Sequence, residues 1–351
     1  MEGVSKTKRT LSAALAMVLA AVLAVGTLLF VTGCSSNSDS GTKSDPITMV
    51  WLPDNSSSDM TASREAVAEV IKNATGRDVE LMTTTDYNVA IEALVSGQAD
   101  MGLLGPEGYV QANGKNNAVQ AAFTNSDEAG TLDEACYYSR ISVLSENADE
   151  YKSGDSYSID NIKGKSFSFV SATSTSGFKV PSSGIVEKFG LDSSDQLLDD
   201  GAFFSSVMFG DSHQGSAVNL LSGNAEVAAF DDVDVDTYLD LVSGEANTVG
   251  AVYKVKDDAE APFDSVRGKE FTIIGITPVL NSPFIYNTDE LTEDEQKAIT
   301  DAFCSEETAN NSAIFVDPDD PNAAGLFEKD SENTCFLPVE DAWYDPIRKL
   351  G

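Results

Sequence analysis

The chain has a single histidine among its 351 residues, His213, and only four cysteines. No two cysteines form a CxxC pair, and no cysteine and histidine stand at the short spacing of a zinc site. We therefore predict no metal site and no cofactor. The sequence also lacks a G-x-S-x-G motif, the strand-to-helix turn that exposes the nucleophile of many serine hydrolases. A hydrolase that used Ser174 or Ser176 as nucleophile would have to use His213 as its base, and we predict that the chain is not an enzyme.

Basic residues are scarce as well. The chain has 22 lysines and arginines against 57 aspartates and glutamates, which gives a net charge of −35. Such an imbalance repels nucleic acid and anionic lipid surfaces, so neither is an expected partner. If the ligand is an anion, the long-range field opposes its approach, and the binding site must supply strong local hydrogen-bond donors.

One long hydrophobic run is present, close to the N-terminus. Lysine and arginine at positions 6, 8 and 9 precede the apolar residues 11–31, and the run ends in Val31-Thr32-Gly33-Cys34. This ending resembles the bacterial lipobox, in which small residues precede a cysteine that is lipidated and becomes the new N-terminus. The resemblance implies a lipoprotein signal peptide over residues 1–33 and lipidation of Cys34; the alternative is an uncleaved membrane anchor. Both place the chain outside the cytoplasm, at the cell surface or in the periplasm, and held to the membrane.

The residues that follow the lipobox are polar and small. Residues 34–45 are rich in serine, cannot bury a core and are expected to form a flexible tether. The folded part then has about 300 residues, which suits two lobes of ordinary domain size. Outside the cytoplasm, a disulfide between Cys304 and Cys335 is consistent with the sequence. Cys136 would then remain as a small buried hydrophobic residue.

Strand-like and helix-like runs alternate beyond the tether, which is typical of an α/β fold. We predict strands at residues 47–51 and 79–82, and a helix over residues 61–73 that ends at a glycine. Asp86 is expected to begin a second helix with Val89 on its apolar face, and Gly97 to end it.

A short internal similarity suggests that this unit occurs twice. Residues 94–105 and 220–231 both read as a helix end, a glycine turn, a carboxylate and a short buried strand. Strand-like runs at residues 137–144 and 271–286 are candidates for the two crossings between lobes. We therefore expect one lobe from residues 46–140 and 275–351 and the other from residues 141–274. Ligands of such sheets bind beyond the carboxyl ends of the strands, here after Leu104 and at Asp231.

A loop dense in hydroxyl groups follows the strand predicted at residues 166–170. Residues 171–181 carry five serines and threonines in their first six positions, and helical potential follows at residues 182–189. The N-terminus of a helix offers unpaired N–H groups and a favourable dipole to an anion. The loop is therefore the candidate anion site.

Four segments together resemble one protein family. Ser174-Thr175-Ser176-Gly177-Phe178-Lys179-Val180-Pro181 is similar to the STSG-x-x-x-P signature of the phosphonate and phosphite substrate-binding proteins of ABC importers. Thr85-Asp86-Tyr87, Gly105-Pro106-Glu107-Gly108-Tyr109 and Gly210-Asp211-Ser212-His213 resemble the family's other ligand-facing segments, in the same order. The likeness covers roughly residues 46 to 290.

The resemblance implies a fold, a function and a set of site residues. The fold is the two-lobed periplasmic-binding-protein-like α/β fold (type II), with similar lobes joined by a two-strand hinge. Ser174, Thr175 and Ser176 would hold the oxygens bound to phosphorus, Tyr87 would donate its phenol from the opposite lobe, and His213 would also bind the ligand.

At the edge of the implied site, Asp231 or Asp232 would pair with a ligand substituent or accept a proton from the ligand. Leu104 departs from the pattern, because some members carry a ligand-facing tyrosine there; backbone amides of residues 105–108 are a substitute. The choice among phosphate, phosphite and phosphonate therefore stays open.

The implied function is capture of a small anion by hinge closure and its delivery to an ABC permease, by a monomer. One alternative is a receptor of the same fold for another anion or organic acid, such as a sulfonate or a carboxylate. Another is a surface adhesion protein without a small ligand.

Overall fold

The computed structural model describes residues 45–54, 60–318 and 325–350. Residues 45–351 belong to one compact unit. The predicted signal peptide, Cys34 and all but the last residue of the tether lie outside the described residues. Within the described ranges, no helix is both long enough and apolar enough to cross a bilayer.

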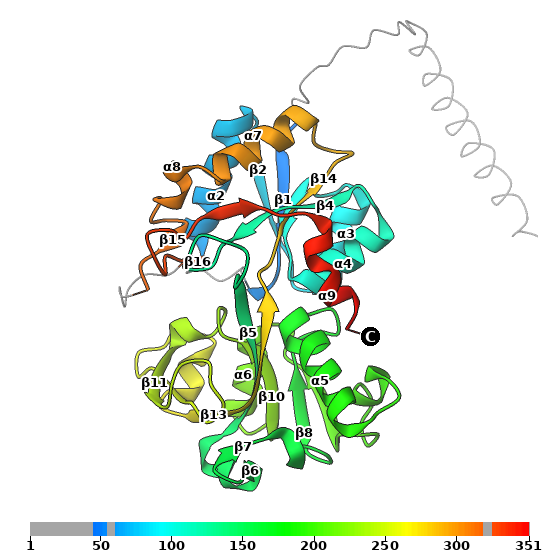
Figure 1. Ribbon diagram of the computed structural model, residues 1–351, viewed down its shortest axis with the longest axis vertical. Coiled ribbons are helices and arrows are strands. Elements are labelled where there is room, and N and C mark those ends of the chain that lie inside the picture. The colour runs from blue at the N-terminus through cyan, green and yellow to red at the C-terminus, as the bar shows by residue number, and fades with distance from the viewer. Residues whose placement is uncertain (1–44, 55–59, 319–324, 351) are drawn as a thin grey trace, which may run out of the picture. The chain divides into compact units, whose positions relative to one another are not determined.

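The first lobe is built on a six-stranded sheet (Figure 1). Its strand order is β17-β4-β14-β3-β1-β2. The strands are β1 (Ile47–Trp51), β2 (Val79–Thr83), β3 (Met101–Leu103), β4 (Val119–Asn125), β14 (Phe284–Asn287) and β17 (Phe336–Pro338). Its helices are α2 (Thr61–Thr75), α3 (Tyr87–Ser96), α4 (Pro106–Lys115), α7 (Glu293–Phe303), α8 (Glu306–Ala309) and α9 (Asp345–Arg348), and a short pair of strands, β15 (Phe315–Val316) and β16 (Phe327–Glu328), lies beside them.

The second lobe is built on a seven-stranded sheet with the order β11-β12-β13-β5-β10-β8-β9. The strands are β5 (Cys136–Leu144), β8 (Ser166–Phe169), β9 (Ser206–Phe209), β10 (Val227–Asp231), β11 (Leu239–Ser243), β12 (Val252–Val255) and β13 (Glu270–Leu280). Its helices are α5 (Val180–Phe189) and α6 (His213–Leu221), and β6 (Lys152–Ser153) pairs with β7 (Ser156–Tyr157).

The two sheets share one topology, which confirms the prediction of two similar α/β lobes. In the first, β1 pairs in parallel with β2 and β3, and β14 runs antiparallel to β3. In the second, β8 pairs in parallel with β9 and β10, and β5 runs antiparallel to β10. The internal similarity in the sequence covers the end of α3 with β3 and the end of α6 with β10, which are equivalent positions in the two sheets.

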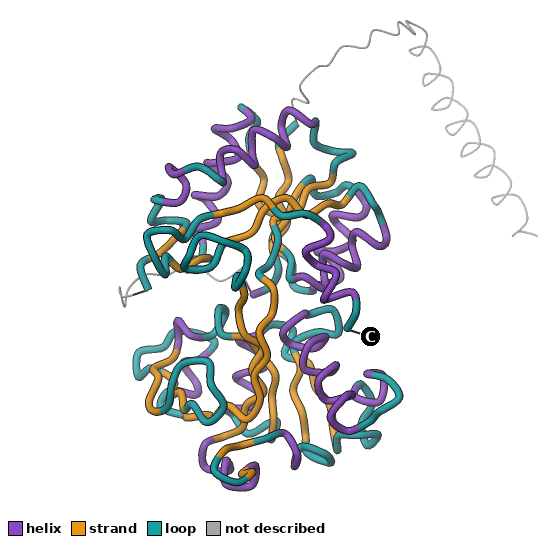
Figure 2. The backbone as a smooth tube through the Cα atoms, viewed as in Figure 1, coloured by secondary structure: helices purple, strands orange, loops and turns teal. Residues whose placement is uncertain are grey.

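Strands β5 and β13 connect the lobes (Figure 2). Their antiparallel pairing begins where Cys136 lies opposite Leu280 and ends where Leu144 lies opposite Phe271, with one irregularity between Ile273 and Gly275. The lobe boundaries predicted at residues 140/141 and 274/275 fall inside these two strands. A pair of extended strands with few other neighbours at one end is a structure that can bend, as a hinge requires.

The helix ends follow the sequence closely. Asp86 is the N-cap of α3 and its carboxylate accepts hydrogen bonds from the N–H groups of Asn88 and Val89. Gly76 and Gly97 end α2 and α3 with φ of 74° each, a conformation that glycine adopts without strain. The prediction for Val89 was wrong, because its side chain is 53% exposed rather than on the buried face.

Each lobe has its own aromatic core. In the first, the Phe123 ring stacks on Phe303 at 4.6 Å and on Phe284 at 4.7 Å between ring centroids. In the second, Phe167 packs against Phe204 at 4.5 Å. The two aromatic clusters are separate, so each lobe has an aromatic core of its own.

The three cysteines in the described part of the chain are free thiols. Burial and the nearby Cys335 raise the pKa of Cys304 to about 11. Cys136 is only half-buried and lines the cleft between the lobes, whereas the sequence predicted a buried position.

Candidate functional site

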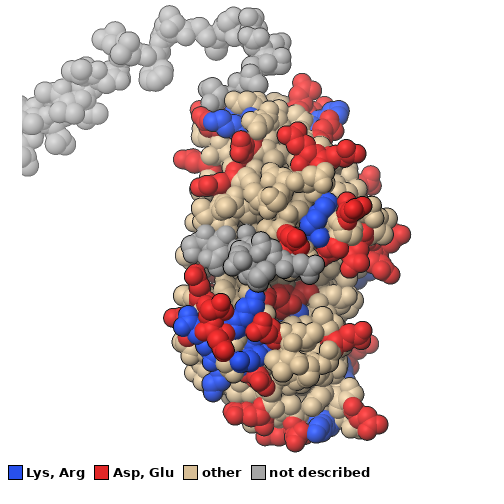
Figure 3. Space-filling view, turned by 90° about the vertical axis from the view of Figure 1, so that its left-hand side faces the viewer, with Lys and Arg blue, Asp and Glu red and all other residues tan. Residues whose placement is uncertain are grey.

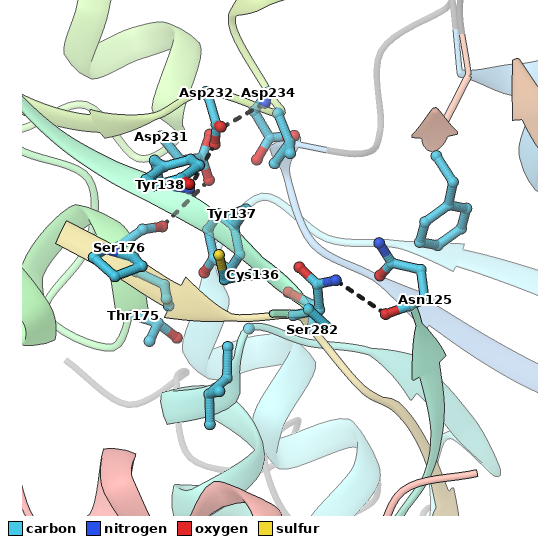
Figure 4. A pocket seen from close by; sticks show the side chains of 18 of the residues that line it. Asn125, Cys136, Tyr137, Tyr138, Thr175, Ser176, Asp231, Asp232, Asp234 and Ser282 are labelled. Atoms are coloured by element: carbon cyan, nitrogen blue, oxygen red, sulfur yellow. Dashed lines mark hydrogen bonds between the residues drawn. The ribbon is translucent and has the colours of Figure 1, made fainter. Parts of the chain in front are cut away.

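A cleft of about 1600 Å³ lies where the two sheets face each other, and segments of both lobes line it. The carboxyl ends of β1 and β3 reach it from the first lobe, and the segments after β8 and β10 reach it from the second. Figure 4 shows Ser176 beside Asp231, with Asp232 and Asp234 on the same side of the cleft. This is the position at which open α/β sheets bind ligands.

Ser174, Thr175 and Ser176 form the N-terminus of a helix in the cleft. Ser174 is the N-cap, and its Oγ accepts a hydrogen bond from the N–H of Gly177 at 3.1 Å. A π-helical turn, Thr175–Lys179, leads directly into α5. The helical segment thus begins at Thr175, seven residues before residue 182, where the sequence predicted the helix to begin. The first N–H groups of a helix have no partner within it, so the amides of Thr175 and Ser176 are available to an anion.

Gly177 allows this turn to form. A Cβ atom at Gly177 would lie 2.3 Å from the Cβ and from a methyl carbon of Val170. Real Cβ contacts are never so short, so any side chain here would push the turn away from the end of β8. The glycine of the signature therefore has a packing role.

His213 is the first residue of α6 and is 3% exposed. Its Nδ1 accepts a hydrogen bond from the N–H of Asp231 at 3.0 Å, so the ring proton lies on Nε2. Nε2 lies 3.4 Å from the Ser174 hydroxyl and 3.3 Å from Oδ2 of Asp231. The histidine therefore presents an N–H donor at the end of the Ser174–Ser176 turn.

Asp231 ends β10 and is buried beside other carboxylates. The Ser176 hydroxyl donates to its Oδ2 at 3.2 Å, and the N–H of Asp234 donates to its Oδ1 at 3.1 Å. Burial, together with the charges of Asp232 and Asp54, raises the pKa of Asp231 well above the usual range of an aspartate. Burial and the neighbouring Asp231 raise the pKa of Asp234 in the same direction. The two carboxyl groups therefore resist carrying two full negative charges.

Asp232 also lines the cleft and belongs to a second hydrogen-bond network. Its carboxylate accepts from the N–H of Tyr138 at 2.8 Å and from the Asn247 side chain at 2.8 Å. Arg140, whose side chain is fully buried, forms an ion pair with Asp236 and donates to Asn247. This network fixes the loop after β10 and with it the position of Asp231.

Tyr87 reaches the cleft from the first lobe, at the start of α3, and is 4% exposed. Its phenol donates to Oδ2 of Asp54, the residue that follows β1 by three positions. Oδ1 of Asp54 in turn accepts from the N–H of His213 at 2.6 Å. Tyr87 and His213, which the sequence analysis assigned to opposite lobes, are thus joined through a carboxylate that it did not identify.

A second hydrogen bond crosses the cleft at Thr175. Its Oγ1 accepts from the N–H of Glu107, at the start of α4, at 2.8 Å. The sequence analysis had considered the amides of residues 105–108 as substitutes for a missing tyrosine; this one is bonded to Thr175. Leu104 is 1% exposed and belongs to an apolar cluster that also contains Val170 of the second lobe.

The cleft is strongly acidic. Thirteen aspartates and glutamates line it, and Lys256 is the one lysine or arginine among the described lining residues. On the face in Figure 3, acidic side chains are more widespread than basic ones. The donors that this cleft offers are helix amides, hydroxyl groups and the His213 ring, and they lie in a surrounding negative field.

One group of side chains has the composition of a metal site. Asp54, His213 and Asp234 bring three potential ligand atoms within 4.8 Å of one another. Both oxygens of Asp54 already accept hydrogen bonds, from Tyr87 and from the backbone of His213. These contacts account for the position of Asp54 without a metal ion.

Every ligand-binding residue predicted from the sequence lies in this cleft: Tyr87, Ser174, Thr175, Ser176, His213 and Asp231. Asp54 and Asp234 were missed. Asp54 follows the carboxyl end of β1, so the rule that ligands bind beyond strand ends could have indicated it. Asp234 lies in an acidic run that gave no other signal.

Comparison with known proteins decides the family. The family model of the ABC transporter phosphonate periplasmic substrate-binding protein matches residues 49–344. The chain belongs to this family. It is a transport substrate-binding protein and not an enzyme.

The chain also resembles individual phosphonate and phosphate binding proteins. It is 28% identical over 226 residues to the phosphate-import protein PhnD of Mycolicibacterium smegmatis, a match that covers 61% of this chain and 67% of the relative. A binding protein component of an ABC phosphonate transporter from Pseudomonas aeruginosa has a TM-score of 0.62 at 15% identity, with 88% and 86% of the chains covered. PhnD1 of Prochlorococcus marinus in complex with methylphosphonate has a TM-score of 0.61 at 14% identity, with 88% and 98% covered. The two solved structures show the two-lobed fold.

Proposed function

We propose that this protein is a lipid-anchored receptor that captures a phosphorus oxyanion and delivers it to the permease of an ABC importer. The observation that carries the proposal is the helix N-terminus at Ser174–Ser176, which lies beside the Nε2 atom of His213. A tetrahedral oxyanion needs several donors that converge on one point, and this arrangement supplies amides, hydroxyl groups and a ring N–H within one turn.

The proposed ligand is a phosphonate, phosphite or phosphate. Its oxygens would accept from the amides of Thr175 and Ser176, from the hydroxyl groups of this turn, and from His213. Asp231 would face the same ligand from the end of β10. Specificity would follow from pairing each ligand oxygen or hydroxyl, since a buried group left without a partner costs about 1–3 kcal/mol.

Capture would proceed by hinge closure. We propose that residues 46–140 with 275–351 form one rigid body and that residues 141–274 form the other, with the bend in β5 and β13. Closure expels water from the cleft, which strengthens each hydrogen bond to the anion. The closed shape would be the form that the permease recognises.

The anchor is the other part of the proposal. Residues 1–33 would be removed as a lipoprotein signal peptide, and Cys34 would carry the lipid. A Cys34→Ser variant is then expected to leave the membrane fraction when cells are lysed and fractionated. Equal membrane retention of the variant and the parent protein would count against lipidation at this residue.

Calorimetric titration tests the ligand assignment. The purified protein is titrated with phosphite, methylphosphonate, aminoethylphosphonate, phosphate and sulfate, alongside His213→Ala and His213→Gln variants. We expect tight binding of one phosphorus oxyanion and a loss of about 10- to 100-fold in His213→Ala. His213→Gln, which keeps an N–H donor, is expected to lose less.

The control is thermal unfolding of all three proteins without ligand. If the folded protein binds no phosphorus oxyanion, the ligand assignment is wrong, and sulfonates and carboxylates are the ligands to test next. An affinity for phosphorus oxyanions that is unchanged in His213→Ala would remove His213 from the site.

A further inference from the structure

Asp54 makes contacts that no motif in the sequence explains. It is 3% exposed and lies just after β1, in the first lobe. Its two carboxylate oxygens accept hydrogen bonds from different lobes: Oδ1 from the N–H of His213 at 2.6 Å, and Oδ2 from the phenol of Tyr87. The Gln214 side chain also donates to its backbone carbonyl at 3.4 Å. A buried carboxylate that bridges both lobes beside the ligand-binding turn is a candidate for a role in recognition.

The bond to Asp54 determines what Tyr87 can offer a ligand. A phenol has one proton, and here that proton is donated to Asp54. The Tyr87 oxygen then has only lone pairs left, so toward the cleft it acts as an acceptor. The resemblance to the family had implied the opposite, a phenol that donates to the ligand.

The surroundings of Tyr87 also favour the protonated phenol. Burial raises the pKa of Tyr87 well above its usual value, and the charges of Asp54, Asp234 and Asp231 add to this effect. Asp54 uses both carboxylate oxygens as acceptors, one for the Tyr87 phenol and one for the His213 N–H. On the first lobe Tyr87 and Asp54 therefore present acceptors, whereas the amides of Thr175 and Ser176 are the donors at the helix N-terminus of the second lobe. The site therefore has a donor side at the helix N-terminus and an acceptor side at Tyr87.

We propose that Asp54 is a specificity-determining residue: by fixing Tyr87 as an acceptor, it makes the site select an oxyanion that carries a hydrogen-bond donor over one of the same shape that carries none. This inference rests on the proposed function and extends it. At neutral pH phosphate retains a P–OH group, whereas sulfate is fully deprotonated. Monoanionic methylphosphonate and methanesulfonate form a second pair with the same difference. A site built to pair a ligand hydroxyl rejects the analogue without it, because its own acceptors are left unpaired.

The test compares these two matched pairs by calorimetry in four proteins: the parent, Asp54→Asn, Tyr87→Phe and the double variant. Asparagine is isosteric with the native aspartate, its side-chain oxygen can still accept from His213, and its amide can donate to the Tyr87 oxygen. The phenol proton is then free to face the ligand. We expect the parent to prefer the phosphorus ligand of each pair at least ~100-fold, and Asp54→Asn to reduce this ratio at least ~10-fold. Glu65→Gln, which removes one charge from the surface of α2, is the matched control and is expected to keep the parent ratio.

Tyr87→Phe keeps the test decisive if Asp54→Asn folds poorly. Loss of an acceptor is expected to weaken phosphate or methylphosphonate and to leave the sulfur ligands unchanged, whereas loss of a donor would weaken both members of each pair. In the Tyr87→Phe background, Asp54→Asn is expected to have no further effect on the ratio. An unchanged ratio in folded Asp54→Asn, or equal weakening of both ligands in Tyr87→Phe, overturns this inference alone. Failure of the parent to bind any phosphorus ligand overturns the proposed function and this inference with it.

Discussion

His213 and Asp231 are joined by a hydrogen bond from the Asp231 backbone N–H to Nδ1 of the imidazole, at 3.0 Å. The same aspartate places Oδ2 3.3 Å from Nε2, on the other side of the ring. The backbone of β10 thus fixes the ring orientation while the Asp231 carboxylate lies next to the ring proton. Both residues are buried, and the pKa of Asp231 is raised by its burial, so the protonation of this carboxyl group and the stability of the second lobe depend on each other.

Asp231→Asn should change the pH dependence of stability. The native pKa of Asp231 is raised by burial and by Asp232 and Asp54. An acid whose pKa is higher in the folded state stabilises the fold at low pH, and this contribution is lost as the pH rises from its ordinary pKa toward the raised one. Asparagine has no charge, so the variant does not lose stability in this way as the pH rises. We expect the melting temperature of the variant, relative to the parent, to be highest at neutral pH and to fall toward pH ~4. A constant difference over this range, measured without ligand, would show that Asp231 is not the group involved.

Thr175→Val should weaken ligand binding through the contact between lobes. Valine has nearly the same shape but cannot accept the hydrogen bond from the Glu107 N–H, which would be left buried and unpaired. The expected loss of affinity is about 10-fold or more. Thr175→Ser keeps the oxygen and is expected to lose less than half of that binding energy. Calorimetry measures both, and equal losses in the two variants would contradict a role for the hydroxyl oxygen.

Gly177→Ala should damage the site more than the fold. The added methyl group would meet Val170 at 2.3 Å and displace the turn that carries Ser174–Ser176. We expect ligand affinity to fall by at least ~10-fold. Gly184→Ala is the matched control, because nothing lies within 4 Å of its Cβ position in α5. It is expected to bind normally and to gain about 0.5–1 kcal/mol in the free energy of unfolding.

Arg77→Leu should destabilise the first lobe far from the site. Arg77 and Glu295 form a buried ion pair at 3.0 Å, with both side chains 5% exposed. Burial alone would raise the pKa of Glu295, but hydrogen bonds from Thr292 and the Arg77 guanidinium together lower it. Removal of one partner leaves a buried charge, so we expect a loss of about 3 kcal/mol in the free energy of unfolding.

The pH dependence of Arg77→Leu has a definite sign. The depressed pKa of Glu295 contributes stability above the ordinary glutamate pKa, and this is lost as the pH falls. The deficit of the variant should therefore shrink in acid. Lys72→Ala, which breaks an exposed ion pair with Asp78, is expected to unfold like the parent in the same denaturant titration. A deficit in Arg77→Leu no larger than in Lys72→Ala would contradict this account.

Much of the fold could be predicted from local sequence. Residues 47–51 form β1 as predicted, and Asp86, Gly76 and Gly97 stand at the helix ends where their chemistry places them. Helix capping and hydrophobic periodicity depend on residues only a few positions apart, so both can be recognised in a single sequence. The helical turn before α5 was not predicted, because the turn at Thr175–Lys179 is π-helical and has no simple period.

The site could be predicted only in part. Motif resemblance identified the Ser174–Ser176 turn, Tyr87 and His213, and the structure brings all of them to one cleft. Asp54 stood outside every motif, and its partner His213 is 159 positions away in the chain. Contacts at such a separation depend on the packing of whole lobes.

The sequence by itself determined an α/β chain with two related lobes, a serine-rich helix N-terminus, and an excess of acid that requires local donors for any anion. These follow from composition, period and motif. Only the tertiary structure decided that the Tyr87 phenol donates to Asp54, that the Glu107 amide donates to Thr175, and that the His213 N–H donates to Asp54. The direction of each of these hydrogen bonds, and hence what remains for a ligand, depends on which groups from different lobes meet, and no local pattern records that.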